Sequence, residues 1–173
     1  MEIKLIKPTL EYSNDIMNYK REFLELGDDL AGCGSLRECS TAKDWIDTIN
    51  LLESEKTCPS DKVTSNLYIA VRLTDNKIVG IIDLRHHINH PVLSLWGGHI
   101  GYSVRPSERK KGYATEMLKQ NLVNCKSYGL DKVLITCNHD NIGSEKVIIA
   151  NGGVFEKNVE VDGNIIKRYW IKL

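Results

Sequence analysis

Residues 101–114 constrain the fold most, because they are patterned as a strand, then a basic turn with a glycine, then the start of a helix. Free main-chain N–H groups in the first turn of a helix, together with the positive end of the helix dipole, attract anions. Arg109, Lys110 and Lys111 add positive charge at this place, and Gly112 lets the backbone approach a ligand closely. The segment therefore predicts an anion site suited to a pyrophosphate.

Composition limits the classes of partner. The length of 173 residues suits one domain spanning residues 1–173. Lys plus Arg number 23 and Asp plus Glu number 23, so no long-range positive field draws the chain onto nucleic acid. Residues 1–8 lack the long apolar core of a signal peptide, and no later run approaches the ~18 apolar residues of a membrane span. We therefore expect a cytoplasmic protein without nucleic-acid or membrane partners.

The cysteines and histidines predict no metal site. The five cysteines form no closely spaced pair of the zinc-ribbon kind, and an odd number suits a disulfide framework poorly, so reduced thiols are expected. Cys125 and Cys137 lie in apolar segments and are expected in the core. Arg85, His86 and His87 end a strand but lack a spaced carboxylate, so we expect an acceptor contact or a solvated loop there.

The first part of the chain predicts one strand and two helices. Residues 2–7 alternate as a strand does, and residues 8–26 are amphipathic with helical spacing. Thr41 and Asp44 resemble a helix cap and predict a second helix. Between these helices, residues 27–35 contain three glycines. That loop is either a mobile lid or a tolerant surface connection.

The remainder of the chain predicts six strands and two further helices. Residues 67–73 and 78–84 favour a hairpin, and residues 94–104 favour a third strand before the basic turn. The following helix should end at Gly129, in the manner of a glycine C-cap. Residues 133–137 predict a buried strand, and a helix after residues 138–141 should end at residues 152–153. Residues 154–161 and 165–173 form a predicted hairpin around Asp162 and Gly163.

The pattern Arg109-Lys-Lys-Gly112-Tyr-Ala114 resembles the acetyl-CoA signature of the GNAT superfamily of N-acetyltransferases, in which Arg or Gln is followed by two residues, Gly, any residue, then Gly or Ala. The order of the predicted elements is also similar to that of the superfamily. The resemblance implies an α/β (α+β) GNAT fold. Its central, mostly antiparallel mixed sheet has seven strands, is flanked by about four helices and is splayed between the fourth and fifth strands.

The resemblance also implies which residues bind acetyl-CoA, with no metal. The main chain of Tyr102 and Val104 would bind the pantetheine amide and the thioester carbonyl, with Val104 as the backbone oxyanion donor. A bulge in that strand is part of the family pattern. Asn141 and Ser144 are further candidate ligands, although each is equally suited to starting a helix. The residues expected at the pyrophosphate are Arg109, Lys110, Lys111, Gly112, Tyr113 and Ala114.

The catalytic groups are less well defined. Many similar proteins have a tyrosine seven residues after the Asn, as general acid, but this chain has Ile148 there. Another group or water would protonate the thiolate, or the thiolate would leave unassisted, since a thiol pKa near ~8.5 makes it a fair leaving group. His99 is either a general base or a histidine satisfied by a neighbouring backbone group. Asp28, Asp29 and Glu38 flank the glycine loop, where negative charge would suit a cationic amine.

Three functional hypotheses follow. The first is an acetyl-CoA-dependent N-acetyltransferase acting on a primary amine of a small molecule or of a protein or peptide. The alternative is a non-catalytic sensor or regulatory module that binds acyl-CoA, which the absence of a tyrosine at position 148 keeps open. The third is a transferase of longer acyl chains. The resemblance also allows a homodimer.

Overall fold

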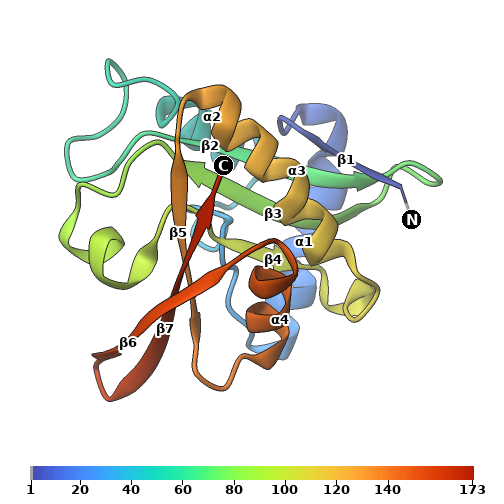
Figure 1. The fold of residues 1–173 in the computed structure, drawn as a ribbon. Helices are drawn as coiled ribbons and strands as arrows, with labels where there is room; N and C mark the ends of the chain where they lie inside the picture. Colours follow the sequence, from blue (N-terminus) through green and yellow to red (C-terminus); the bar gives the residue numbers. More distant parts are fainter. Residues whose placement is uncertain (1) are drawn as a thin grey trace.

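Two antiparallel sheets form the framework of the computed structural model, which describes residues 2–173 (Figure 1). The first sheet has the order β1-β2-β3-β4 and the second the order β5-β7-β6. Six of the seven predicted strands and the separation between the fourth and fifth strands are confirmed, with the sheet divided into two. The strands are β1 (Ile3–Ile6), β2 (Ser65–Arg72), β3 (Ile78–Arg85), β4 (Tyr102–Val104), β5 (Lys132–Asn138), β6 (Val154–Val161) and β7 (Asn164–Lys172).

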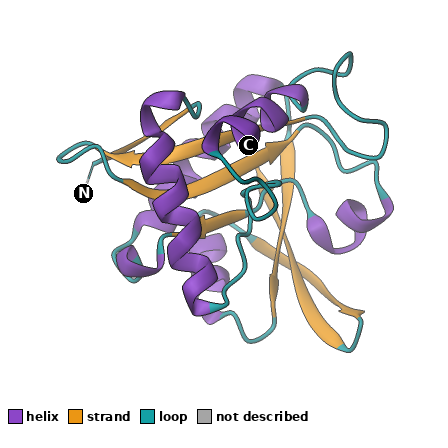
Figure 2. Ribbon diagram, turned by 180° about the vertical axis from the view of Figure 1, so that it is seen from behind, coloured by secondary structure: helices purple, strands orange, loops and turns teal. Residues whose placement is uncertain are grey.

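Helices cover both faces of the first sheet. In Figure 1, α3 (Tyr113–Tyr128) crosses in front of β2 and β3, and Figure 2 shows other helices on the opposite face. Those are α1 (Ser13–Leu26) and α2 (Ala42–Leu51), whose buried residues join one core cluster with residues of β2 and β3. The fourth helix, α4 (Ile142–Ala150), follows β5. Within residues 2–173, no helix is long and apolar enough to cross a membrane.

Local signals explain where the elements begin and end. The hydroxyl of Thr41 accepts a hydrogen bond from the N–H of Asp44 at 3.1 Å and so caps α2 as predicted. Gly129 has φ 103° and ends α3 in the left-handed conformation. Asp162 and Gly163 also have positive φ, as a tight antiparallel hairpin requires. The predictions for these boundaries are confirmed.

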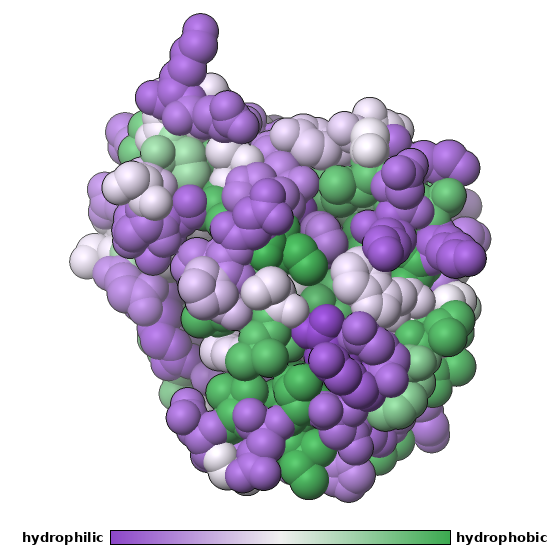
Figure 3. Space-filling view, turned by 60° about the vertical axis from the view of Figure 1, so that its left-hand side comes forward, coloured by the Kyte–Doolittle hydropathy of each residue, from purple (hydrophilic) through white to green (hydrophobic). Residues whose placement is uncertain are grey.

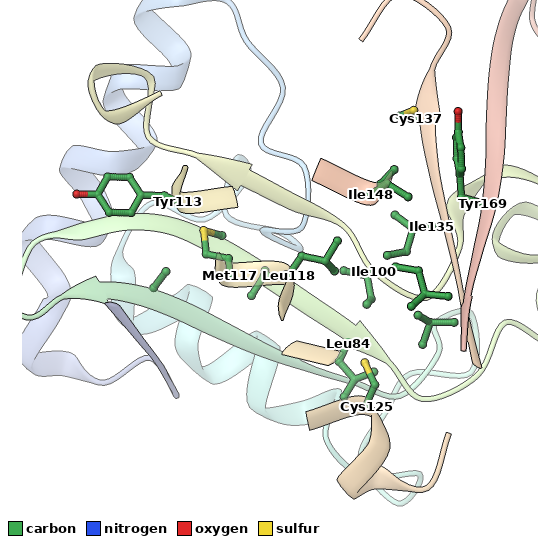
Figure 4. Packing of buried hydrophobic residues seen from close by; sticks show 14 of the residues in the cluster. Leu84, Ile100, Tyr113, Met117, Leu118, Cys125, Ile135, Cys137, Ile148 and Tyr169 are labelled. Atoms are coloured by element: carbon green, nitrogen blue, oxygen red, sulfur yellow. The ribbon is translucent and has the colours of Figure 1, made fainter. Parts of the chain in front are cut away.

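The main core lies between α3 and the two sheets (Figure 4). Met117 and Leu118 of α3 are fully buried against the first sheet, while Ile135 and Tyr169 bring the second sheet into the same cluster. Ile148 of α4 is also fully buried in this cluster. The core therefore fixes the position of α4 and of both sheets relative to α3.

The predicted strand over residues 94–104 is mostly wrong. Only residues 102–104 form β4, and Leu93–Gly97 form a π-helical turn, η2. Side chains from the second sheet bind the carbonyl groups of that turn. Arg168 donates to the carbonyls of Ser94 and Leu95, and Thr136 donates to the carbonyl of Trp96. These contacts hold residues 94–96 at the second sheet, and hydrogen bonding of the chain to β3 begins at His99.

The glycine loop over residues 27–35 is anchored in the protein at Gly32 and Cys33, which are buried. Cys33 is fully buried, and its carbonyl accepts a hydrogen bond from the Trp45 indole at 2.7 Å. A Cβ added to Gly32 would lie 2.2 Å from the carbonyl oxygen of Gly101. The packing at residues 32–33 does not fit a tolerant surface connection, and the mobile lid stays a prediction. The loop instead lies against the chain that enters β4.

Candidate functional site

The two sheets are joined at His99, and they part beyond it. The N–H of His99 donates to the carbonyl of Leu134 at 2.8 Å, and the N–H of Leu134 donates to Nδ1 of His99 at 2.9 Å. Beyond this point β4 pairs only with β3, and β5 pairs only with β7. Within residues 2–173, β4 and β5 therefore each have one edge that pairs with no other strand.

The free edge of β4 carries the main-chain groups of Tyr102 and Val104. The main-chain N–H of Arg105 donates to the carbonyl of Val79 at 2.9 Å, and the main-chain N–H of Asp83 donates to the carbonyl of Gly101 at 3.0 Å. Because antiparallel hydrogen bonding alternates along a strand, Tyr102 and Val104 turn their N–H and C=O groups away from β3. An extended chain can add to such an edge.

The bulge implied for β4 is not present as a register shift. The pairs from Gly80↔Val104 to Ile82↔Tyr102 are regular, and the main-chain N–H of Arg85 still donates to the carbonyl of His99. One main-chain hydrogen bond between β3 and the chain that enters β4 is replaced by a side-chain bond. The N–H of Gly101 donates to the carboxylate of Asp83 at 2.5 Å, while the Asn121 amide occupies the carbonyl of Asp83 at 2.9 Å. Buried side chains therefore hold β4 where a bulge was expected.

The turn between β4 and α3 has main-chain N–H groups that make no hydrogen bond to the described residues. Lys110 has φ 61° and Gly112 has φ 80°, both left-handed. Among the described residues, no acceptor lies within hydrogen-bond range of the N–H groups of residues 110–115. Successive N–H groups in such a turn form a nest for anions, and the dipole of α3 points its positive end here. The arrangement is suited to binding a pyrophosphate.

The side chains of the turn are mostly engaged within the protein. Arg109 pairs with Asp28 at 2.6 Å and lies over the Phe23 ring at 5.4 Å. Lys111 pairs with Glu108 at 2.8 Å. The Tyr113 ring is buried and its hydroxyl accepts from Arg72 at 3.0 Å, whereas Ala114 is half-buried. The main chain is thus the larger part of this anion site.

Two hydroxyl groups connect β4 to the start of α4. Tyr102 Oη lies 2.7 Å from Ser144 Oγ, and burial raises the pKa of Tyr102 to about 12. The side chain of Asn141 accepts from the N–H of Ser144 at 3.0 Å, so Asn141 caps α4. Sequence reasoning placed Tyr102 and Ser144 in the site separately. It missed the contact between their side chains, because the two residues are 42 positions apart.

His99 is buried at the junction of the sheets. Its Nδ1 accepts the Leu134 N–H, so in the neutral ring the proton is on Nε2. Burial, with a smaller contribution from Arg85, lowers the pKa of His99 to about 4. A base that is neutral but already bonded at its lone pair is poorly placed to take a proton from an amine. This geometry favours the structural role over the catalytic one.

The other polar residues singled out in the sequence are dispersed. His86 stacks on Tyr128 with ring centroids 3.9 Å apart, while Arg85 donates to the carbonyls of Gly97 and Gly98. Residues 2–173 contain no group of three His, Cys, Asp or Glu side chains that could hold a metal ion. Asp28 is committed to Arg109. Asp29 lies 3.9 Å from Arg37 and is fully exposed. Of the acids that flank the glycine loop, Asp28 is therefore not free to bind a cationic amine.

Solved structures with the same fold include several acetyltransferases. RimL, a ribosomal L7/L12 alpha-N-protein acetyltransferase in complex with coenzyme A, is 14% identical, with a TM-score of 0.71 over 99% of this chain and 94% of that one. The microcin C7 self-immunity acetyltransferase MccE, in complex with acetyl-CoA and AMP, is 19% identical, with a TM-score of 0.64 over 99% and 93%. The ribosomal-protein-S5-alanine acetyltransferase from Vibrio fischeri is 20% identical, with a TM-score of 0.66 over 98% and 91%.

Comparison at the sequence level gives a family but no individual relative. No curated protein matches the chain. The family model described as the acetyltransferase (GNAT) domain matches residues 15–154, which include the β4 edge, the anion turn and α4. The chain therefore belongs to the GNAT acetyltransferase domain family.

Proposed function

We propose that this protein is an acetyl-CoA-dependent N-acetyltransferase that acts on a primary amine of a small molecule or of a protein or peptide. The observation that carries the proposal is the set of free N–H groups over residues 110–115, which follows the free edge of β4 in the chain. A diphosphate on the turn and an amide-containing arm along β4 match the chemistry of coenzyme A. Residues 1–173 would act as one domain.

The proposed reaction depends mainly on positioning. The amine nitrogen, entering as the neutral base, forms a bond to the thioester carbon, and the N–H of Val104 donates to the oxygen that becomes negative. The carbon–sulfur bond then breaks and its electron pair leaves with the sulfur. The proton lost by the amine goes to solvent. The Tyr102–Ser144 hydroxyl pair, which reaches from β4 to α4, supplies a hydrogen bond to the departing sulfur.

The acceptor is best sought among protein N-termini. Structural neighbours are named as acetyltransferases of ribosomal protein L7/L12, modifying its N-terminal serine, and of ribosomal protein S5 at alanine. The proposal also includes small amines, because Asp28, an acid of the glycine loop, is paired with Arg109 and is not free to select a cationic acceptor.

Thiol release from acetyl-CoA in the presence of an amine panel tests the proposed function. The panel contains free amino acids, polyamines, aminoglycosides and short peptides that begin with serine or alanine. We expect thiol release that depends on one class of amine, with mass spectrometry showing one added acetyl group. A sensor of acyl-CoA would bind the donor and release no thiol with any amine, and that result would refute the proposal. Donors with longer acyl chains test the third hypothesis in the same assay.

A further inference from the structure

Glu108 is a buried acid directly before the anion turn. Its side chain is about 6% exposed and accepts from three cations. Arg72 Nη1 lies at 2.9 Å, Lys77 Nζ at 2.8 Å and Lys111 Nζ at 2.8 Å. These cations come from the end of β2, the β2–β3 connection and the turn itself. Several charge-assisted bonds to one buried carboxylate are far more constraining than an exposed ion pair.

The contacts of Glu108 reach both ends of the turn. Lys111 is part of the turn, and Arg72 also bonds the hydroxyl of Tyr113, the first residue of α3. Arg72 is held in turn by Asp75 at 2.7 Å. One carboxylate thus links the entrance to the turn, its middle and the start of the helix to the β2–β3 hairpin.

The turn needs such support, because its conformation is not the one its residues adopt freely. Lys110 has φ 61° although it is not glycine, and a left-handed lysine persists only where its surroundings hold it. Left-handed residues in a turn let successive N–H groups form an anion-binding nest, so the site depends on this conformation.

Electrostatics alone would make Glu108 unfavourable at this place. The hydrogen bonds from Lys111 and Lys77 lower the pKa of Glu108 to about 2, so the side chain is ionised near neutral pH. A negative charge next to an anion site repels the ligand. Two effects of opposite sign therefore meet at one residue, and a charge-removing substitution shows which of them dominates.

We propose that Glu108 is a positioning residue of the donor site, which holds the turn over residues 110–112 in its ligand-binding conformation before acetyl-CoA arrives. This inference rests on the proposed function. Preorganisation of a binding loop raises affinity by reducing the ordering that must occur on binding. The gain from holding the turn outweighs the repulsion between Glu108 and the pyrophosphate.

The test compares Glu108→Gln with Glu116→Gln by titration with acetyl-CoA. Glu116 lies in the first turn of α3, is 38% exposed, lies 3.9 Å from Lys119 and accepts a hydrogen bond from the Gln120 amide at 2.9 Å. A glutamine keeps an acceptor for that amide, so Glu116→Gln removes the same charge without releasing the turn. We expect Glu108→Gln to raise the Kd for acetyl-CoA by about tenfold. Glu116→Gln should leave that Kd unchanged or lower it by no more than about threefold.

Further measurements separate positioning from general damage to the fold. With saturating donor, kcat and the KM for the amine should match wild type in Glu108→Gln. Glu108→Asp keeps the charge but shortens the side chain, so we expect an intermediate rise in the Kd for acetyl-CoA, and this variant carries the test if Glu108→Gln does not fold. Unchanged or tighter binding by both Glu108 variants would overturn the inference. Failure of the wild type to bind acetyl-CoA would instead refute the proposed function.

Discussion

At the scale of single residues, Gly32 shows how closely the α1–α2 loop approaches the strand that enters the site. A Cβ at this position would lie 2.2 Å from the Gly101 carbonyl oxygen and 2.7 Å from the Tyr102 nitrogen, and φ is +74°. A side chain at residue 32 would therefore push on the main chain of β4 where the donor is proposed to lie.

Replacing Gly32 by alanine should lower stability and displace the β4 edge. We expect a loss of about 2–4 kcal/mol in the free energy of unfolding, from strain at positive φ together with overpacking. Gly27→Ala is the matched control, since Gly27 has φ +68° but nothing within 4 Å of an added Cβ, and strain alone should cost about 1 kcal/mol. Urea unfolding of both variants measures the difference. Equal losses would show that the contact with Gly101 is unimportant.

His99 gives a prediction about pH. Because its pKa is lowered to about 4, His99 stays neutral in the folded protein as pH falls from 6.5, whereas it takes up a proton in the unfolded chain. Its contribution to stability is therefore complete above about pH 6.5 and declines as pH falls toward about 4.

If His99 is not the general base, the pH dependence of kcat/KM should follow the deprotonation of the amine acceptor. Two amines of different pKa should give different inflections, and both should persist in His99→Asn.

One outcome would restore His99 as the base. An inflection in kcat/KM that is the same for both amines and disappears in His99→Asn would require a titrating group on the enzyme at this position.

At the scale of elements, the Tyr102–Ser144 contact joins β4 to α4 across the point where the two sheets have parted. If these hydroxyls assist the departing sulfur, Tyr102→Phe should lower kcat by about tenfold or more, while the Kd for acetyl-CoA changes little. The selenium analogue of acetyl-CoA has a better leaving group, so the loss should shrink with that donor. An equal loss with both donors would assign Tyr102 a structural role only.

The elements that could be predicted from the sequence are those with local signals. The cap at Thr41, the glycine end of α3 and the Asp162–Gly163 turn are each determined by residues a few positions apart. The segment over residues 93–97 could not be predicted, because its carbonyl groups bind Arg168 and Thr136 of the second sheet. Apolar composition alone made it look like a continuation of β4.

The same distinction applies to the site. The anion turn follows from its glycine, its basic residues and its place before a helix. The side-chain partners in the turn could not be foreseen, because Asp28 reaches Arg109 from the end of α1, and Arg72 reaches Glu108 from β2. For His99 the pattern left two roles open, and the packing against Leu134 favours the structural one.

At the scale of the whole molecule, the site combines parts of both sheets. The first sheet provides the β4 edge and the anion turn, while β5 of the second sheet leads through Asn141 into α4, which carries Ser144. A continuous core fixes the two parts relative to one another. Polar and apolar residues are interspersed over the face in Figure 3, and the formal net charge is +0. Attraction of an anionic donor therefore has to come from the local turn and not from the field of the protein.

Titration of the wild type and of Gly112→Val with acetyl-CoA tests that central claim most directly. Nothing lies within 4 Å of a Cβ added to Gly112, so valine would not collide with the protein, but φ +80° is strained for a β-branched residue and its side chain would occupy space beside the N–H groups. We expect wild type to bind one acetyl-CoA per chain and Gly112→Val to bind at least about tenfold more weakly while it stays folded. Lys110→Ala, the control, should weaken binding much less. Equal affinities for wild type and folded Gly112→Val would contradict the claim that residues 110–115 hold the donor.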